Sequence, residues 1–188
     1  MNALIPDGYF ASVADIDLTF DVLNKGYTSV LLDIDNTVRS RCNNLVPHSI
    51  AVWIEKACSL GVSVCLVSNN WHQNIFVMQR ELGIPVFGKA LKPLPFGFQS
   101  ARRALQVEKS QMLMVGDQLV TDILGAHWYG IAAYLVAPLA PCDPPYTALM
   151  RRFEAGVVAS RFPKPVCRAG CNAQQSVANV NVCQEHRA

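Results

Sequence analysis

Two aspartates one residue apart are the residues of this sequence most suited to chemistry. Asp33 and Asp35 belong to the segment DIDNT (residues 33–37), which directly follows the apolar run Ser29–Leu32. Alternation along a strand points both carboxylates to the same side, where like charges repel unless a cation or a shared proton compensates. A magnesium ion favours such oxygen ligands, and it would leave one aspartate to act as a nucleophile and the other as an acid or base. A simple Asp/Asn turn at the end of a strand is the alternative.

Polar side chains also follow apolar runs further along the chain. They are Ser68 and Asn69 (after Val62–Val67), Lys92 (in residues 89–93), and Asp117 and Asp122 (after Met112–Val115). The carboxyl ends of the strands of an open parallel sheet line one crevice, where ligands bind. We therefore expect these side chains and the two aspartates to converge there. A carboxylate cluster, a hydroxyl and a lysine together suit a phosphate bound with magnesium.

The motifs DxDNT, SNN, Lys-Pro and GDQxxTD stand in this order in the chain. Their order and spacing resemble the haloacid dehalogenase-like (HAD) phosphatase superfamily, and within it subfamily IIIA, the branch of YqeG and phosphatidylglycerophosphatase. The resemblance covers roughly residues 5 to 155. It implies that Asp33 is a nucleophile that becomes an aspartyl-phosphate. It also implies that Asp35 protonates the leaving group and then acts as the base for the hydrolytic water.

The resemblance assigns roles to the remaining site residues. Ser68 and Lys92 would bind the phosphoryl oxygens. Asn69 would either offer its backbone N–H to the phosphate, at the start of a helix, or simply cap that helix. The implied Mg²⁺ ligands are Asp33, the backbone carbonyl of Asp35, and Asp117, with Asp122 as a partner behind them or a ligand through water.

Two other classes of protein share part of this pattern. A phosphoacceptor receiver domain also combines a parallel sheet with an aspartate, a hydroxyl and a lysine, but its phosphorylated aspartate lies on a later strand. The DxD pair also supplies an acid/base that a receiver lacks. A phosphatase fold that has lost its activity would usually lack the nucleophile, the acid, the lysine or a metal ligand, and none is missing here. A magnesium-dependent phosphatase is therefore the predicted function.

The elements that must position these residues alternate between strand and helix. Strands are expected at 28–33, 62–67, 85–87, 112–115 and 131–136, and helices at 17–23, 47–60, 70–82, 95–105, 120–129 and 146–154. Strands separated by helices imply right-handed crossovers and a parallel sheet. The expected fold is an α/β, three-layer Rossmann-like core of the HAD type.

The spacing of the motifs leaves no room for a cap domain. Only 33 positions separate Asp35 from Ser68, and 24 separate Ser68 from Lys92. We therefore expect a site that is open to solvent and to large substrates, such as a phosphate on a macromolecule or on a lipid head group. The resemblance points to phosphatidylglycerophosphate, and a soluble small-molecule phosphate is the alternative.

The composition of the chain limits the other classes of protein to which it could belong. A chain of 188 residues with 51% hydrophobic and 16% charged residues predicts a globular domain, which we place at residues 1–160. A net charge of +2 is too small to indicate nucleic-acid binding. No apolar stretch reaches the ~20 residues of a transmembrane helix, and the N-terminus lacks the pattern of a signal peptide. Seven cysteines fit reduced thiols in the cytoplasm.

Two features are left with open alternatives. Peripheral membrane contact could use Leu4, Ile5, Tyr9 and Phe10, or the pairs Arg102–Arg103 and Arg151–Arg152, although packing on the sheet and a solvated face are the favoured interpretations. The tail at residues 161–188 is expected to be flexible, with incidental cysteines. The alternative is a zinc site of Cys167, Cys171, Cys183 and His186. The sequence leaves the oligomeric state open.

Overall fold

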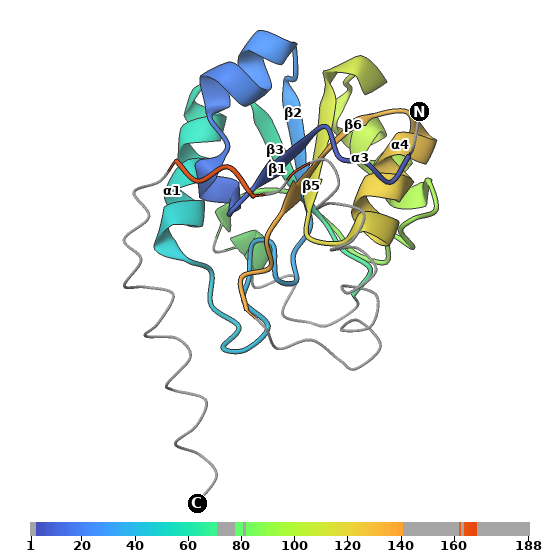
Figure 1. Ribbon diagram of the computed structural model, residues 1–188. Coiled ribbons are helices and arrows are strands. Elements are labelled where there is room, and N and C mark those ends of the chain that lie inside the picture. The colour runs from blue at the N-terminus through green and yellow to red at the C-terminus, as the bar shows by residue number, and fades with distance from the viewer. Residues whose placement is uncertain (1–2, 71–77, 81, 141–161, 163, 169–188) are drawn as a thin grey trace, which may run out of the picture.

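A single six-stranded parallel sheet organises the protein, as the computed structural model shows for residues 3–70, 78–80, 82–140, 162 and 164–168 (Figure 1). The strands are β1 (Gly8–Phe10), β2 (Ser29–Leu32), β3 (Ser63–Val67), β4 (Val86–Phe87), β5 (Met112–Gly116) and β6 (Ala132–Val136). Their spatial order is β1-β6-β5-β2-β3-β4, and every neighbouring pair is parallel.

Helices cover both faces of the sheet. They are the α-helices α1 (His48–Ser59), α3 (Phe96–Leu105) and α4 (Gly125–Tyr129), the π-helical turns η2 (Leu18–Val22) and η5 (Leu119–Leu124), and the 3-10 turns η1 (Val13–Asp15), η3 (Leu23–Lys25) and η4 (Lys109–Gln111). Helix α1 lies on one side of the sheet, and α3 and α4 lie on the other (Figure 1).

Alternating strand residues build two cores. In β2, Val30 and Leu32 pack into the core beneath α1, whereas Leu31 packs into the core beneath α3 and α4. The strands β3 and β5 alternate in the same way. Because both faces are buried, the central strands read as continuous apolar runs. The three-layer parallel α/β fold expected from the sequence is confirmed.

The strand β1 was not among the expected elements. Its residues pair with β6, with Tyr9 opposite Leu135 and Phe10 opposite Val136. Phe10 is only 4% exposed, and Tyr9 packs on the core beneath α4. The N-terminal aromatic residues therefore pack on the sheet, which was the favoured interpretation, and lipid contact by this segment stays an untested alternative.

Three of the expected helices form differently or lie partly or wholly outside the described residues. Asp17 begins the first helical segment as expected, because its Oδ1 accepts the backbone N–H groups of Thr19 and Phe20 at 2.8 Å each. The segment forms a π turn and a 3-10 turn, and it ends at Gly26 with φ of +82°. Of the helix expected at 70–82, only residues 78–80 and 82 are described as helix. The helix expected at 146–154 lies outside the described residues.

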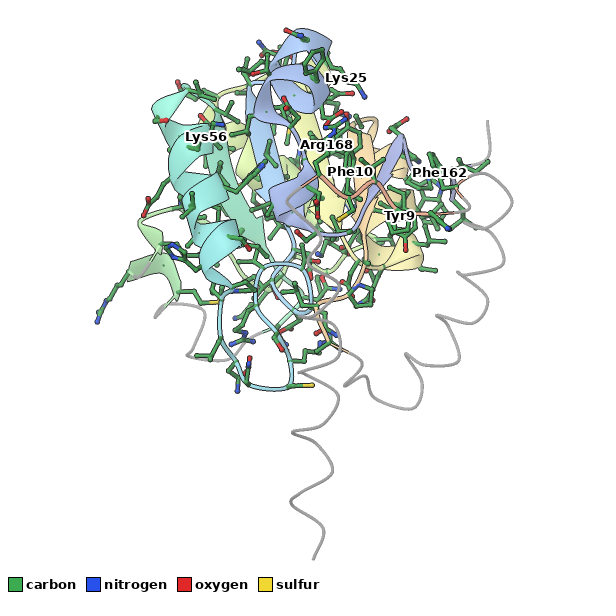
Figure 2. All side chains as sticks on the ribbon, turned by 60° about the vertical axis from the view of Figure 1, so that its left-hand side comes forward. Tyr9, Phe10, Lys25, Lys56, Phe162 and Arg168 are labelled. Atoms are coloured by element: carbon green, nitrogen blue, oxygen red, sulfur yellow. The ribbon has the colours of Figure 1, made fainter. Side chains whose placement is uncertain are left out.

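The described part of the C-terminal segment packs on β1. The backbone N–H of Val166 donates to the Tyr9 carbonyl at 2.9 Å, and that of Ala11 donates to the Val166 carbonyl at 2.8 Å. Arg168 lies beside Phe10 (Figure 2), and its guanidinium donates to Asp21. The domain boundary placed at residue 160 stays a prediction. The described residues beyond this boundary extend the edge of the sheet.

The cysteines do not all carry free thiols. Cys58 and Cys65 are free, whereas Cys42 and Cys167 are each disulfide-bonded. The expectation of seven reduced thiols is therefore wrong, and a disulfide-bonded Cys167 is not a thiolate ligand for zinc. The other three residues of the suggested zinc site lie outside the described residues. Among the described helices, none is long and apolar enough to cross a bilayer.

Candidate active site

A cavity of about 280 Å³ opens at the carboxyl ends of the strands. Asp33 follows β2, Ser68 follows β3, Lys92 follows β4, and Asp117 follows β5. The side chains that line the cavity are those of Asp33, Asp35, Arg41, Ser68, Asn69, Asn70, Lys92, Gln118 and Thr121. The parallel topology thus brings together residues that are far apart in the sequence.

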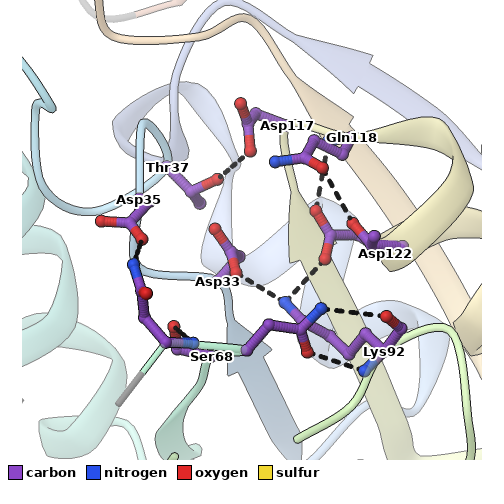
Figure 3. Close-up of polar contacts among 11 residues, drawn as sticks. Asp33, Asp35, Thr37, Ser68, Lys92, Asp117, Gln118 and Asp122 are labelled. Carbon is purple, nitrogen blue, oxygen red and sulfur yellow. Dashed lines mark hydrogen bonds and ion pairs between the residues drawn. The ribbon is translucent and has the colours of Figure 1, made fainter. Parts of the chain in front are cut away.

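Lys92 lies between two aspartates at the centre of the site (Figure 3). Its Nζ donates to Asp33 Oδ1 at 2.5 Å and to Asp122 Oδ1 at 2.7 Å. Burial alone would lower the pKa of Lys92, but the two carboxylates outweigh burial and raise it. The lysine is therefore a fixed positive charge at the nucleophile predicted from the sequence.

Three carboxylates form a cluster that suits a divalent cation. Oxygen atoms of Asp33, Asp117 and Asp122 all lie within 4.8 Å of one another. Burial raises the pKa of Asp33 to about 8, and the neighbouring carboxylates add to this effect while Lys92 opposes it. Three carboxylates beside a single lysine, which pairs with Asp33 and Asp122, leave an excess of negative charge. Hard oxygen ligands of this kind are those that Mg²⁺ prefers. The residues present therefore fit Mg²⁺.

The cluster differs in one respect from the ligand set implied by the sequence. Asp122 lies within the cluster itself and not behind it. Its Oδ2 also accepts the backbone N–H of Gln118 at 3.1 Å. The side chain of Asp35 does not belong to the cluster (Figure 3), and a contribution from its backbone carbonyl stays a prediction. Asp117 accepts the Thr37 hydroxyl at 3.4 Å.

Asp35 is held by hydrogen bonds on both of its carboxylate oxygens. Arg39 Nη2 donates to Oδ1 at 2.7 Å, and Asn70 Nδ2 donates to Oδ2 at 2.6 Å. Burial by itself would raise the pKa of Asp35, but these two hydrogen bonds outweigh burial and hold the pKa below its ordinary value. The resting site therefore favours the ionised form of Asp35, which is the form that a base requires.

Arg39 and Asn70 are site residues that the sequence did not identify. Arg39 is only 9% exposed. A bridge between Asp35 and Arg39 folds the loop after β2 back on itself, and the Arg39 N–H donates to the Ile34 carbonyl at 2.9 Å. This loop geometry, which sequence spacing does not reveal, turns the guanidinium onto Asp35.

Ser68 and Asn69 line the cavity beside Lys92. Ser68 Oγ accepts the Asn70 backbone N–H at 3.0 Å, so its hydroxyl proton can be donated to a ligand. Asn69 makes two hydrogen bonds with the Lys92 backbone, at 2.7 Å and 2.9 Å. Its side chain therefore fixes the loop that carries the lysine, while a contact of its backbone N–H with phosphate stays a prediction.

Gly116 allows Asp122 to reach the cluster. A Cβ atom at this position would lie 2.2 Å from Asp122 Oδ2. We expect Gly116→Ala to push this carboxylate away from Lys92, to weaken Mg²⁺ binding at least about tenfold, and to destabilise the fold by about 1–3 kcal/mol. Calorimetric titration with Mg²⁺ and thermal unfolding measure the two effects.

Gly8→Ala is the matched control for the steric clash that an added Cβ atom causes. Its Cβ would lie 2.8 Å from a ring carbon of Phe10 on β1, so it should lower stability without changing Mg²⁺ affinity. Unchanged Mg²⁺ affinity in Gly116→Ala would show that Asp122 does not contribute to the metal site.

The site has no cap among the described residues. Between Asp35 and Ser68 the chain forms one loop, α1 and β3, and the described residues between Ser68 and Lys92 include the end of a helix and β4. Over the part of the chain that the structure describes, the absence of a cap domain expected from the spacing is thus confirmed.

Comparisons with known proteins agree with this geometry. A family model described as HAD-hydrolase-like matches residues 90–138. The probable phosphatase YqeG of Bacillus subtilis is 34% identical over 132 residues, which cover 70% of this chain and 76% of that protein. The phosphatidylglycerophosphate phosphatase 1 of Arabidopsis thaliana is 26% identical over 165 residues, covering 78% of this chain and 46% of that protein.

Solved structures support the fold. The cobalt-bound deoxy-D-mannose-octulosonate 8-phosphate phosphatase YrbI from Haemophilus influenzae superposes with a TM-score of 0.51 at 14% identity, covering 73% of this chain and 90% of that one. An uncharacterized protein from Listeria monocytogenes has a TM-score of 0.50 at 19% identity, covering 67% of this chain and 99% of that one.

These findings identify the chain as a phosphoric monoester hydrolase of the HAD type. Within that superfamily it belongs to the YqeG-like family of subfamily IIIA. The resemblance seen in the sequence is confirmed.

Proposed function

We propose that this protein hydrolyses a phosphomonoester with Mg²⁺, through an aspartyl-phosphate formed on Asp33. The observation that carries the proposal is the pairing of Asp33 with Lys92, within a buried carboxylate cluster at an open cleft. A nucleophile, a fixed cation and ligands for a metal ion then lie together at one site.

In the first step, a carboxylate oxygen of Asp33 attacks the phosphorus atom, and the bond to the leaving oxygen breaks. Lys92 and the Ser68 hydroxyl hold the phosphoryl oxygens and stabilise the charge that develops on them. The Asp35 carboxyl donates its proton to the leaving oxygen. Because the arriving phosphate brings negative charge close to Asp35, it raises the pKa of this group and favours protonation.

In the second step, a water molecule attacks the phosphorus of the aspartyl-phosphate. Asp35 takes a proton from this water, and phosphate leaves as Asp33 is regenerated. The hydrogen bonds from Arg39 and Asn70 stabilise the ionised Asp35 that acts here as the base. The cation, held by Asp33 and Asp117 with Asp122 beside them, would offset the repulsion between the nucleophile and the phosphate.

Asp35→Asn tests the acid/base step. We expect phosphate release from alkyl phosphates to fall about 100- to 10,000-fold, because their poor leaving groups need a proton. An aryl phosphate with a good leaving group should lose much less in the rate of its first step. Burst kinetics over a series of esters separate this step from the second. An equal loss in the first step for every ester would contradict the role of Asp35 as an acid.

The proposed substrate is phosphatidylglycerophosphate. The Arabidopsis relative is named for this activity, although the chain spans about half of that relative's length. The uncapped cleft supports the proposal because a large lipid head group can reach it without a closing domain. Phosphate release is compared for the lipid in mixed micelles and for a panel of soluble phosphomonoesters. A preference for a soluble ester would keep the mechanism and reject the lipid.

A cytoplasmic location is the remaining part of the proposal. The disulfide-bonded Cys42 and Cys167 weigh against it, since cytoplasmic thiols are usually reduced. Cell fractionation, together with thiol labelling of the protein before and after reduction, tests this assignment.

A further inference from the structure

Two residues that line the active-site cavity have no role in the proposed mechanism. They are Gln118, which directly precedes η5, and Thr121, which lies on η5. Both are partly exposed, whereas Asp117 and Asp122, on either side of them in the sequence, are buried in the carboxylate cluster. The segment after β5 therefore supplies two buried acidic groups and, between them, two neutral polar side chains at the cavity wall.

Local structure does not account for the side chain of Gln118. This residue occupies the N-cap position of η5, but its side chain makes no capping hydrogen bond. Its contact with Asp122 Oδ2 uses the backbone N–H, which any residue other than proline would supply. The side-chain Oε1 instead accepts the Thr121 hydroxyl at 3.3 Å. We call these two side chains the amide–hydroxyl pair.

The amide–hydroxyl pair offers both donors and acceptors to a ligand. With the Thr121 hydroxyl donated to Oε1, the Nε2 hydrogens of Gln118 can donate, and the Thr121 oxygen keeps a lone pair that can accept. Turning the amide by 180° makes the Thr121 hydroxyl a donor and Oε1 an acceptor, so both kinds of group remain. Ionised phosphoryl oxygens only accept hydrogen bonds, whereas a hydroxyl group both donates and accepts. The pair therefore matches a hydroxyl group better than it matches the phosphate.

The position of the pair relates it to the alcohol part of an ester. Gln118 lies across Asp33 from Ser68 (Figure 3), and all three residues line the cavity of about 280 Å³. In the proposed mechanism, Ser68 and Lys92 hold the phosphoryl oxygens, and Asp35 meets the leaving oxygen. The opposite wall, where the pair lies, is then left to the carbon atoms of the alcohol and to the groups that they carry.

We infer that Gln118 and Thr121 bind a hydroxyl group of the substrate, and that the substrate is a phosphomonoester of a polyol with a hydroxyl next to the phosphorylated carbon. This inference rests on the proposed phosphatase function and names the class of alcohol within it. The glycerol head group of phosphatidylglycerophosphate and a soluble glycerol phosphate share this chemistry.

The test measures binding without turnover, with Asp33→Asn protein and Mg²⁺. Calorimetric titration compares each enantiomer of 2-hydroxypropyl phosphate with propyl phosphate, which lacks only the hydroxyl group. We expect the better enantiomer to bind about three- to tenfold more tightly than propyl phosphate. Adding Gln118→Met should bring the ratio of the two Kd values to about one. Because this change keeps the backbone N–H that bonds Asp122, Mg²⁺ affinity should not change.

Controls on both residues separate hydroxyl recognition from structural effects. Thr121→Val should reduce the preference, because it removes the hydroxyl at nearly constant volume, whereas Thr121→Ser should retain it. Gln99 is exposed on α3 and lies outside the cavity lining, so Gln99→Met should leave both the preference and the Mg²⁺ affinity unchanged. Thermal unfolding of each variant shows whether it is folded.

Two outcomes would overturn the hydroxyl site. They are equal affinity of the parent protein for the two esters, and an unchanged preference in Gln118→Met, even if that variant binds both esters more weakly. Hydrolysis with Asp33 intact tests the proposed function separately. If wild type hydrolysed neither ester while the binding preference persisted, the phosphatase proposal would fail and the hydroxyl site would stand. Rates with glycerol phosphate and with phosphatidylglycerophosphate in mixed micelles distinguish the soluble source of this chemistry from the lipid.

Discussion

Asp33→Asn is expected to reduce phosphate release by at least about a thousandfold with every ester, because an amide is a far weaker nucleophile than a carboxylate. The loss should appear at saturating substrate and Mg²⁺, since the reaction lacks its first bond-forming step. Steady-state phosphate release by purified protein measures it.

A folding defect should not account for the loss of phosphate release in Asp33→Asn. Burial and two neighbouring carboxylates raise the pKa of Asp33, so an uncharged isostere removes a destabilising charge, and the thermal midpoint should not fall. Asp15→Asn is the matched control. Asp15 is only 4% exposed, but it accepts the Arg168 backbone N–H and lies outside the cavity. A fast, Mg²⁺-dependent rate in Asp33→Asn would reject Asp33 as the nucleophile.

Lys92→Met is expected to affect both catalysis and stability. Loss of the fixed cation at the phosphoryl oxygens should lower turnover about 100- to 1,000-fold. In the absence of Mg²⁺, it also leaves two buried carboxylates, those of Asp33 and Asp122, without their cation. Breaking a buried ion pair in this way should cost about 3–5 kcal/mol of unfolding free energy. Denaturant unfolding at neutral pH measures the second effect.

Mg²⁺ should partly reverse the loss of stability in Lys92→Met. A cation that binds the folded state stabilises it by mass action, and the variant cluster carries one more uncompensated negative charge than the wild type. The rise in thermal midpoint on adding Mg²⁺ should therefore be larger in the variant. Lys92→Arg, which keeps the charge, is the control for stability. If Lys92→Met had the same unfolding free energy and the same turnover rate as the wild type, Lys92 would serve neither stability nor catalysis.

The sequence predicted the core of the fold because the central strands are buried on both faces. Val30, Leu31 and Leu32 alternate between two cores, so the run is apolar throughout and ends where the polar residues begin. The strand β1 escaped prediction because its three residues, one of them glycine, are too few to show a period. Its place is set by pairing with β6, which is a tertiary contact.

The sequence could predict those site residues that directly follow a strand. Asp33, Ser68 and Asp117 each follow an apolar run, and parallel topology then brings them together. Asn70 and Arg39 carry no such signal. Their contacts with Asp35 depend on the direction of side chains in two loops, and loop geometry is not encoded in hydrophobic periodicity. The place of Asp122 in the cluster likewise depends on the close approach at Gly116.

A covalent phosphate on Asp33 is the central claim, and chemical trapping tests it most directly. The protein is mixed with a fast aryl phosphate and Mg²⁺, quenched in acid and reduced with borohydride, and its peptides are then analysed by mass spectrometry. Reduction converts an aspartyl-phosphate into homoserine, and this product is expected at position 33 only when substrate and Mg²⁺ are both present. Rapid turnover without any homoserine at position 33, or with homoserine at another aspartate, would contradict the account.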